Sequence, residues 1–222
     1  MSRDDRGVLF DLDGVLIDSE QAHFEATRQA FRHLRLPELT EDLYRSQMIG
    51  RPDREAIAAA MHALGIPASW LEPVLEAKAG FYQELLAAGR VDLLVDGIAA
   101  VHAALEAGYP VALVTGALAV EAHWALRAAG LMGRITTVVT AEDVRAGKPD
   151  PEPYRTACSR LGVEPGRSVA AEDSPAGVAA GRAAGLRVLA VARQPFPELA
   201  AADRVVTVLS WEAIADLLAR SR

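Results

Sequence analysis

Two aspartates, separated by one residue, follow a short apolar run near the start of the chain. The segment "VLFDLDG" places Asp11 and Asp13 directly after three apolar residues. A carboxylate that emerges from a buried strand is held rigidly, so it can attack phosphorus and become phosphorylated. A second carboxylate two positions later can protonate the leaving oxygen and then deprotonate water. The pair therefore predicts phosphoryl transfer, with Asp11 as nucleophile and Asp13 as general acid and base.

The same residues also fit a purely structural role. Asp-Gly between apolar runs is a strong hairpin signal, because both turn positions favour positive φ. In that interpretation Asp13 and Gly14 form a turn, and Asp11 is a polar residue at the end of a strand. The types of residue at the ends of the other expected strands distinguish between the two interpretations.

The overall composition limits the class of protein. The chain has 222 residues, a net charge of −7, 51% hydrophobic residues and 24% charged residues, which is typical of a globular protein. An acidic surface argues against nucleic acid or an anionic membrane as a partner, and no obligatory protein partner is indicated. The start of the sequence lacks a signal-peptide pattern, and charged residues interrupt every long apolar run. We therefore expect a soluble, cytoplasmic protein.

From residue 92 onward, β-branched apolar runs alternate with helical patterns. Capping residues and glycines mark the helix ends: we expect Asp96, Asp150 and Ser174 to begin helices, and Gly185 to end the last of these. Alternating strands and helices predict right-handed βαβ units. The expected fold class is α/β, with a parallel sheet of at least five strands covered on both faces.

Residues 17–90 break this alternation. Three stretches within them have helical patterns, and no convincing strand is visible. The three stretches are "EQAHFEATRQAFRHL", "DREAIAAAMHALG" and "WLEPVLEAKAGFYQELLAAG". A helical segment of this length between the first and second strands is best explained as an inserted domain. We therefore expect an α/β core of residues 1–16 and 91–222, and a helical cap of residues 17–90.

Polar residues suited to phosphoryl transfer stand at the ends of the other expected strands. Thr115 and Gly116 follow the second strand, Lys148 lies in a loop after the third, and Glu172 and Asp173 end the fourth. Ligands bind beyond the carboxyl ends of the strands in parallel sheets, so we expect these residues to share a pocket with Asp11. The Thr115 hydroxyl, the Lys148 ammonium and backbone N–H groups can hold the phosphoryl oxygens.

The expected pocket collects more negative than positive charge. Its four carboxylates contribute about −4 at neutral pH, against about +1 from Lys148. Without a cation, their mutual repulsion would raise their pKa values and weaken Asp11 as a nucleophile. Mg²⁺ takes oxygen ligands while keeping bound waters, and Asp11 with Asp173 can supply such ligands. The sequence therefore predicts Mg²⁺ as the cofactor.

Four segments, taken in order, carry a resemblance to a known family. "DLDGVLIDSE", "VTGA", "GKPDPEPY" and "EDSPAGVAAGRAAG" resemble the four motifs of the haloacid-dehalogenase-like hydrolase superfamily, in the branch that includes β-phosphoglucomutase. Each motif alone is weak, but the ordered set is specific and covers nearly the whole chain. The resemblance implies a Rossmann-like core, an α-helical cap inserted after the first motif, and Mg²⁺.

The resemblance also implies residue roles. Asp11 would be both nucleophile and metal ligand, while Asp13 would be the general acid and base and would offer its backbone carbonyl to the metal. Thr115 and Lys148 would bind the phosphoryl group. Asp173 would ligate Mg²⁺, with Glu172 supporting that site.

Two activities of this branch remain open. A phosphatase transfers the phosphoryl group to water, whereas a mutase returns it to another hydroxyl of a sugar phosphate. Candidate substrate-binding residues are Gly116 in the core and His23, Arg51, Arg54 and Lys78 in the cap. His23 has the spacing of the mutase histidine, and the cap cations could grip a remote phosphate, although they fit solvated charges equally well.

Departures from the mutase pattern favour a phosphatase. Ala117 and Leu118 stand where the resembled mutases offer a serine and a lysine, and Thr27 stands where a tryptophan is common. Asp13 argues against dehalogenation, because displacing a halide requires no proton donor to an oxygen leaving group. We expect a phosphohydrolase acting on a small phosphorylated metabolite, such as a sugar phosphate. A sugar-phosphate mutase is the alternative, followed by a non-catalytic module that binds phosphometabolites.

Overall fold

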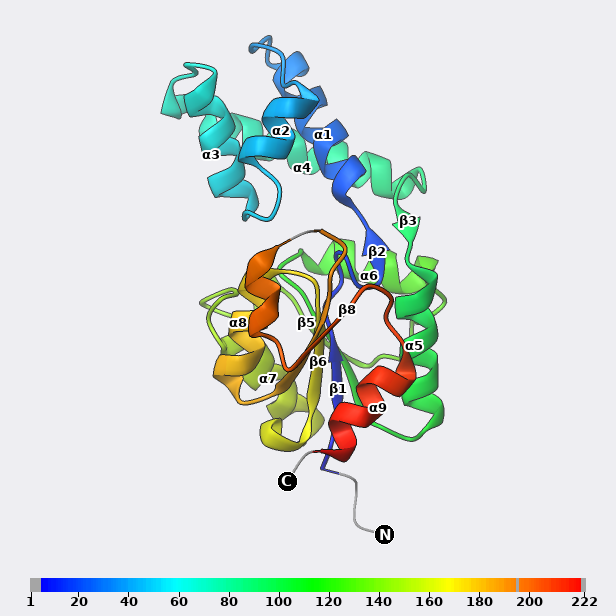
Figure 1. The fold of residues 1–222 in the computed structure, drawn as a ribbon. Helices are drawn as coiled ribbons and strands as arrows, with labels where there is room; N and C mark the ends of the chain where they lie inside the picture. Colours follow the sequence, from blue (N-terminus) through cyan, green and yellow to red (C-terminus); the bar gives the residue numbers. More distant parts are fainter. Residues whose placement is uncertain (1–4, 195, 221–222) are drawn as a thin grey trace. The chain divides into compact units, whose positions relative to one another are not determined.

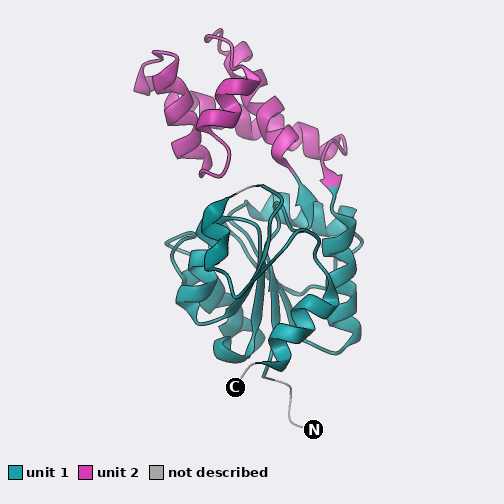
Figure 2. Cartoon of the chain, in the orientation of Figure 1, with its two compact units in different colours: residues 1–18, 93–222 teal, residues 19–92 magenta. Residues whose placement is uncertain are grey.

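The computed structural model describes residues 5–194 and 196–220. The chain divides into two compact units, shown in different colours in Figure 2: unit 1 is residues 1–18 with 93–222, and unit 2 is residues 19–92. The chain passes from one unit to the other after residues 18 and 92, whereas the sequence predicted these boundaries after residues 16 and 90. The role of unit 2 as a cap stays a prediction.

Unit 1 is built on a parallel sheet, which has six strands within the described residues (Figure 1). The strands are β1 (Val8–Phe10), β4 (Val111–Val114), β5 (Thr137–Val139), β6 (Val169–Glu172), β7 (Arg187–Val191) and β8 (Arg204–Val206). Their order is β5-β4-β1-β6-β7-β8, and every pairing is parallel. The predicted α/β core is confirmed, and β1 lies in its centre between β4 and β6.

Helices cover both faces of this sheet (Figure 1). They are α5 (Val95–Glu106), α6 (Ala119–Ala128), α7 (Glu152–Leu161), α8 (Pro175–Ala184) and α9 (Trp211–Ala219). The helices α7 and α8 pack together on one face, and α5 and α9 pack together on the other. Leu9 belongs to the core under α7 and α8, while its neighbours Val8 and Phe10 are equally buried. Because strand side chains alternate between faces, β1 is enclosed on both sides.

The predicted limits of α8 are confirmed. The Ser174 hydroxyl accepts a hydrogen bond from the Gly177 N–H at 3.0 Å, and the helix begins at Pro175. Gly185 ends it with a φ of 94°, a conformation that glycine adopts without the steric cost of a Cβ.

Two other predicted helix starts are wrong. Asp96 does not cap α5: Leu94 is at the N-cap, and both Asp96 carboxylate oxygens instead accept from the Arg193 guanidinium at 2.7 Å. Asp150 lies one residue too early, because Pro151 is at the N-cap of α7. Its carboxylate still accepts from the Glu152 N–H at 2.8 Å. Spacing alone could not reveal the competing partner of Asp96, which lies far along the chain.

Unit 2 is helical. It comprises α1 (Glu20–His33), α2 (Glu41–Gln47), α3 (Asp53–Ala63) and α4 (Leu71–Ala87), with α1 packed along α4 and α3 also against α4. The sequence predicted α1, α3 and α4. It missed α2, which is too short to show helical periodicity, although Thr40 caps it by accepting from the Leu43 N–H at 3.2 Å.

Short elements complete the fold. The expectation that residues 17–90 contain no strand is wrong at their start, because β2 (Ile17–Asp18) pairs with β3 (Asp92–Leu93). Strands of two residues are too short to produce an alternating pattern. The 3₁₀ turns are Ala68–Trp70, Ala141–Asp143, Pro165–Arg167 and Pro197–Ala201. In the part of the chain that the structure describes, no helix combines the length and apolar character of a membrane span.

Gly97 in α5 provides a test of the packing in unit 1. A Cβ built at this position would lie 1.8 Å from the Val15 carbonyl oxygen, so the backbone would have to move. We expect Gly97→Ala to lower the free energy of unfolding by about 1–3 kcal/mol, although alanine is the better helix former. The matched control is Gly80→Ala in α4, where a Cβ meets nothing within 4 Å. Thermal unfolding followed by circular dichroism measures both, and a Gly97→Ala variant as stable as the wild type would contradict this packing.

Candidate active site

Asp11 is the first residue after β1, at the carboxyl end of the sheet. Its backbone N–H donates to the Ala171 carbonyl on β6 at 3.0 Å, and the residue is only 7% exposed. Because β1 pairs with a strand on each side, the backbone of Asp11 has little freedom to move. The predicted nucleophile is thus held on a rigid element.

Lys148 connects the ends of three strands. Its Nζ lies 2.8 Å from Asp11 Oδ1 and 2.5 Å from Glu172 Oε1, and it donates to the Val114 carbonyl at 3.0 Å. Val114 ends β4, Asp11 follows β1, and Glu172 ends β6. Burial alone would lower the pKa of Lys148, but the two carboxylates outweigh it and raise the pKa. The Lys148 ammonium therefore stays protonated at neutral pH.

The carboxylate of Glu172 is completely buried and has donors on both oxygens. Oε1 accepts from the Tyr154 hydroxyl at 2.6 Å as well as from Lys148. Oε2 accepts from the Asp173 N–H and from the Ser174 hydroxyl, both at 3.2 Å. A buried carboxylate needs such partners, and here they also fix its orientation.

Three carboxylates converge in a way that fits a divalent cation. Asp11, Glu172 and Asp173 each offer an oxygen, and these oxygens lie within 4.8 Å of one another. Burial, followed by the charges of Asp11 and Glu172, raises the pKa of Asp173 to about 9. Burial and the charge of Glu172 likewise raise the pKa of Asp11 to about 7, against the lowering effect of Lys148. Oxygen ligands with excess negative charge suit Mg²⁺, so these residues could hold it.

The chain turns at Gly14, but not as the two-residue Asp-Gly hairpin turn of the structural interpretation, because Asp13 lacks the positive φ and instead pairs with Ile17 in an isolated bridge. Gly14 has a φ of 68°, and its N–H donates to the Ile17 carbonyl at 2.8 Å. A Cβ at Gly14 would lie 1.9 Å from Asp173 Oδ2, so the turn runs directly against the carboxylate cluster. Asp13 is near enough for its charge to raise the pKa values of Asp11 and Asp173. The turn and the predicted chemistry are therefore compatible.

Thr115 and Gly116 follow β4, the neighbour of β1. Thr115 is buried, and its N–H donates to the Val139 carbonyl at 2.9 Å. Its hydroxyl oxygen accepts from the Ala117 N–H at 3.0 Å, which leaves the hydroxyl proton to donate. Gly116 is exposed. Sheet order places both residues at the same edge as Asp11.

Two of the predicted cap residues lie together within unit 2. Lys78 Nζ is 2.8 Å from His23 Nδ1 and 2.5 Å from Asp53 Oδ2, and the Lys78 side chain is only 4% exposed. The His23 ring stacks on Tyr82 with 4.2 Å between ring centroids. The Lys78 ammonium also lies 4.9 Å from the centroid of the Tyr82 ring. We call these four residues the Lys78 cluster.

The two predicted arginines have surface positions. Arg54 makes two hydrogen bonds to the Glu72 carboxylate, at 2.6 and 2.9 Å, and both side chains are exposed. Arg51 is exposed as well. Arg54 therefore forms a solvated ion pair, which is one of the two roles that the sequence allowed for it.

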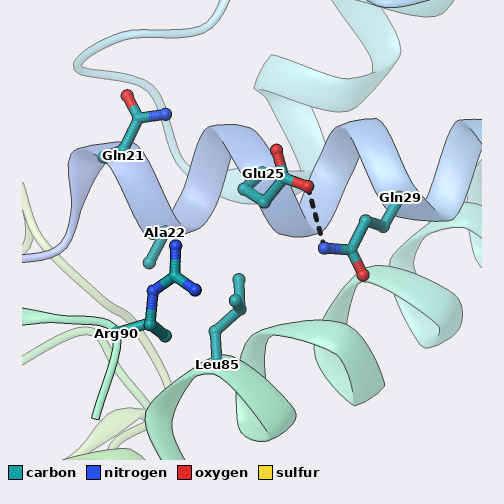
Figure 3. A pocket seen from close by; sticks show the side chains of 6 residues that line it. All are labelled: Gln21, Ala22, Glu25, Gln29, Leu85 and Arg90. Carbon is teal, nitrogen blue, oxygen red and sulfur yellow. Dashed lines mark hydrogen bonds between the residues drawn. The ribbon is translucent and has the colours of Figure 1, made fainter. Parts of the chain in front are cut away.

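Unit 2 also has an open pocket between α1 and α4 (Figure 3). It is lined by Gln21, Ala22, Glu25, Gln29, Leu85 and Arg90. Glu25 Oε1 accepts from Gln29 Nε2 at 2.9 Å, and both residues lie on α1 (Figure 3). The lining includes none of the predicted site residues.

Sequence reasoning missed several residues that contact the predicted ones. Tyr154 ends the motif "GKPDPEPY", and its position after Lys148 could have suggested a shared role. Arg193 donates to the Gly14 carbonyl at 3.1 Å and so ties the aspartate turn to Asp96, but no local signal marks it. Asp53, the partner of Lys78, lies between the candidates Arg51 and Arg54 in the sequence, and no local signal marked it as that partner.

Comparisons with known proteins identify the family of the chain. Residues 6–185 match the family described as haloacid dehalogenase-like hydrolase, and the chain belongs to that family. It is 35% identical over 180 residues to validoxylamine A 7'-phosphate phosphatase from Streptomyces hygroscopicus subsp. limoneus, which covers 80% of this chain and 81% of that protein. It is 37% identical over 186 residues to a phosphorylated carbohydrates phosphatase from Thermotoga maritima, covering 81% of each.

Structural similarity extends over most of the chain. A CbbY variant from Rhodobacter sphaeroides, in complex with xylulose-1,5-bisphosphate, has a TM-score of 0.79 and 26% identity, covering 91% of this chain and 94% of that one. Together the comparisons confirm the predicted superfamily and fold, and the predicted class of enzyme, a phosphatase.

The raised pKa of Asp173 predicts how a divalent cation affects stability. With a folded-state pKa of about 9 against an ordinary value of 3.8, this carboxyl contributes stability at low pH that is lost as the pH rises through 9. A bound cation favours the ionised carboxylate, so Mg²⁺ should raise Tm more at about pH 9 than at about pH 6. Thermal unfolding with Mg²⁺ or with EDTA measures this difference. An equal or smaller rise at the higher pH would contradict the prediction.

Proposed function

We propose that the protein is a Mg²⁺-dependent phosphatase that acts on a small phosphorylated metabolite, such as a sugar phosphate, through a phosphorylated aspartate. One observation carries the proposal. Asp11, at the end of the central strand, contacts the Lys148 ammonium at 2.8 Å and shares a cluster of carboxylate oxygens with Glu172 and Asp173. The named phosphatases among its relatives act on phosphorylated carbohydrates and on validoxylamine A 7'-phosphate.

In the first half of the reaction, an Asp11 carboxylate oxygen attacks phosphorus while the ester oxygen leaves. Asp13 donates the proton that this leaving oxygen needs. Lys148 exchanges its contact with Asp11 for a phosphoryl oxygen and keeps its contacts with Glu172 and Val114. The Thr115 hydroxyl and nearby backbone N–H groups donate to the other phosphoryl oxygens.

In the second half, Asp13 takes a proton from water, which attacks the same phosphorus atom. Inorganic phosphate leaves, and the Asp11 carboxylate is restored. Asp11, Asp173, Glu172 and the Asp13 backbone carbonyl would hold Mg²⁺. When bound, the ion would neutralise part of the negative charge of the phosphate and of the carboxylates.

The charge arrangement of unit 2 favours a phosphatase over the alternative, a sugar-phosphate mutase. A mutase must hold a second phosphate while the sugar turns over. Of the cap cations predicted for that role, Lys78 is paired with Asp53 and Arg54 with Glu72. The Asp53 carboxylate opposes the attraction of the buried Lys78 ammonium for a phosphate, whereas the exposed Arg54–Glu72 pair has little effect. The CbbY structure holds a bisphosphate, however, so substrates with one and with two phosphates have to be compared directly.

Substitution of Asp53 tests this argument. Asp53→Asn removes the negative charge beside Lys78, so kcat/KM for a sugar bisphosphate should rise about fivefold relative to the matching monophosphate, equivalent to about 1 kcal/mol. Asp42→Asn, at an exposed position in α2, is the matched control and should leave the ratio unchanged. An unchanged ratio in Asp53→Asn would mean that this pair does not govern the choice of substrate.

The covalent step is tested at Asp11. An amide of the same size cannot attack phosphorus, so Asp11→Asn should lower Mg²⁺-dependent phosphate release from a sugar phosphate at least about a thousandfold. Circular dichroism should show an intact fold. Residual activity above a tenth of the wild-type rate would rule out Asp11 as the nucleophile.

The same assays separate the remaining alternatives. Isomerisation of glucose 1-phosphate faster than phosphate release would identify a mutase. Thermal stabilisation by sugar phosphates without any phosphate release would identify a binding module. The cytoplasmic location, and the expectation of no nucleic-acid, membrane or obligatory protein partner, stay predictions.

A further inference from the structure

Tyr154 contacts two charged groups of the candidate active site. It lies on α7, which packs against β4 and β5, and it is completely buried. Its hydroxyl donates to Glu172 Oε1 at 2.6 Å, and the centroid of its ring lies 5.3 Å from Lys148 Nζ. A buried phenol with these two contacts restrains both the carboxylate and the ammonium.

The position of Lys148 during the reaction depends on Glu172. Phosphorylation removes the negative charge of the Asp11 carboxylate, so the contact between the Lys148 ammonium and Asp11 becomes weaker at that stage. The contacts with Glu172 and with the Val114 carbonyl then hold the ammonium in place. The Val114 partner is a backbone carbonyl that the sheet fixes, whereas the Glu172 partner is a side chain with rotatable bonds. Its orientation therefore has to be set by its other partners.

Those partners enclose Glu172 from two helices. On one side the Tyr154 hydroxyl holds Oε1. On the other side Gly177 of α8 leaves the space that the carboxylate fills, because a Cβ at Gly177 would lie 1.9 Å from its Cδ and from its Oε2. Glu172 is therefore confined between α7 and α8, and Tyr154 is the hydroxyl donor from α7.

We propose that Tyr154 is a positioning residue of the active site. Its hydroxyl fixes the orientation of Glu172. Through Glu172 it holds Lys148 in place for the phosphoryl group, and it keeps the carboxylate oxygens of the cation site close to one another. This inference rests on the proposed function for its catalytic consequence. Its consequence for Mg²⁺ binding can be measured without turnover.

Tyr154→Phe keeps the ring and its packing and removes only the hydroxyl. Loss of a hydrogen bond behind a metal ligand typically costs 10–100-fold in metal affinity or activity. We expect the Kd for Mg²⁺, measured by isothermal titration calorimetry, to be about tenfold higher than in the wild type. We expect kcat to be about tenfold lower and KM to stay within about twofold of the wild-type value. The control Tyr109→Phe makes the same chemical change where the ring packs against Trp211, and should leave both values unchanged. A folded Tyr154→Phe protein with Mg²⁺ affinity and kcat within twofold of wild type would overturn the inference.

Gly177→Ala tests the same carboxylate with Tyr154 intact. The added Cβ displaces Glu172 from the α8 side, so it should weaken Mg²⁺ binding to a similar extent, whereas the helical control Gly80→Ala should not. Unchanged Mg²⁺ affinity in Gly177→Ala would overturn the role given to Glu172 even if Tyr154→Phe failed to fold.

A double-mutant cycle shows whether Tyr154 acts through Glu172. In a Glu172→Ala background the phenol has lost its acceptor, so adding Tyr154→Phe should weaken Mg²⁺ binding less than twofold further. Independent, additive losses would contradict a shared pathway. If the wild-type protein released no phosphate from any ester, the proposed function would fail, while the three Mg²⁺ titrations would still decide the role of Tyr154.

Discussion

The buried ammonium of Lys148 is the constraint on which the candidate site depends. It is the cation shared by Asp11 and Glu172, and it lies beside Asp173, whose pKa is raised by its burial and by those two carboxylates. Removing this ammonium would leave the buried carboxylates without a compensating charge, which is strongly destabilising. The sheet order explains how the group assembles: β4, β1 and β6 are neighbours, so their carboxyl ends deliver the three partners of Lys148 to one place.

Much of this assembly could be predicted from the sequence, because most of the candidate residues stand at the ends of apolar runs, although Lys148 lies in a loop. The strand ends fixed the positions of Asp11, Thr115, Glu172 and Asp173, and parallel topology then brought the ends together. Local signals also located α8. They failed for Asp96, because a long-range contact with Arg193 replaced the expected cap. They failed for α2 and β2 because elements this short have no measurable period.

Side-chain partners were less predictable than positions. Lys78 was chosen as a cation that could bind a remote phosphate, and nothing in its local sequence indicated that Asp53 would neutralise it. Tyr154 stood in a recognised motif, but only the structure shows its hydroxyl on Glu172. Both pairs join residues from different helices or from a helix and a strand. Such contacts depend on packing, which sequence spacing does not encode. We expect them to determine the choice of substrate and the precise positions of the active-site side chains.

The central claim is that Asp11 becomes phosphorylated during turnover. The most direct measurement is rapid acid quenching of the wild-type protein with Mg²⁺ and a labelled sugar phosphate, followed by peptide mapping. We predict a phosphoryl group on the peptide that contains Asp11, formed and lost at rates that account for phosphate release. Steady phosphate release with no label on Asp11, or with the label on another residue, would contradict the account.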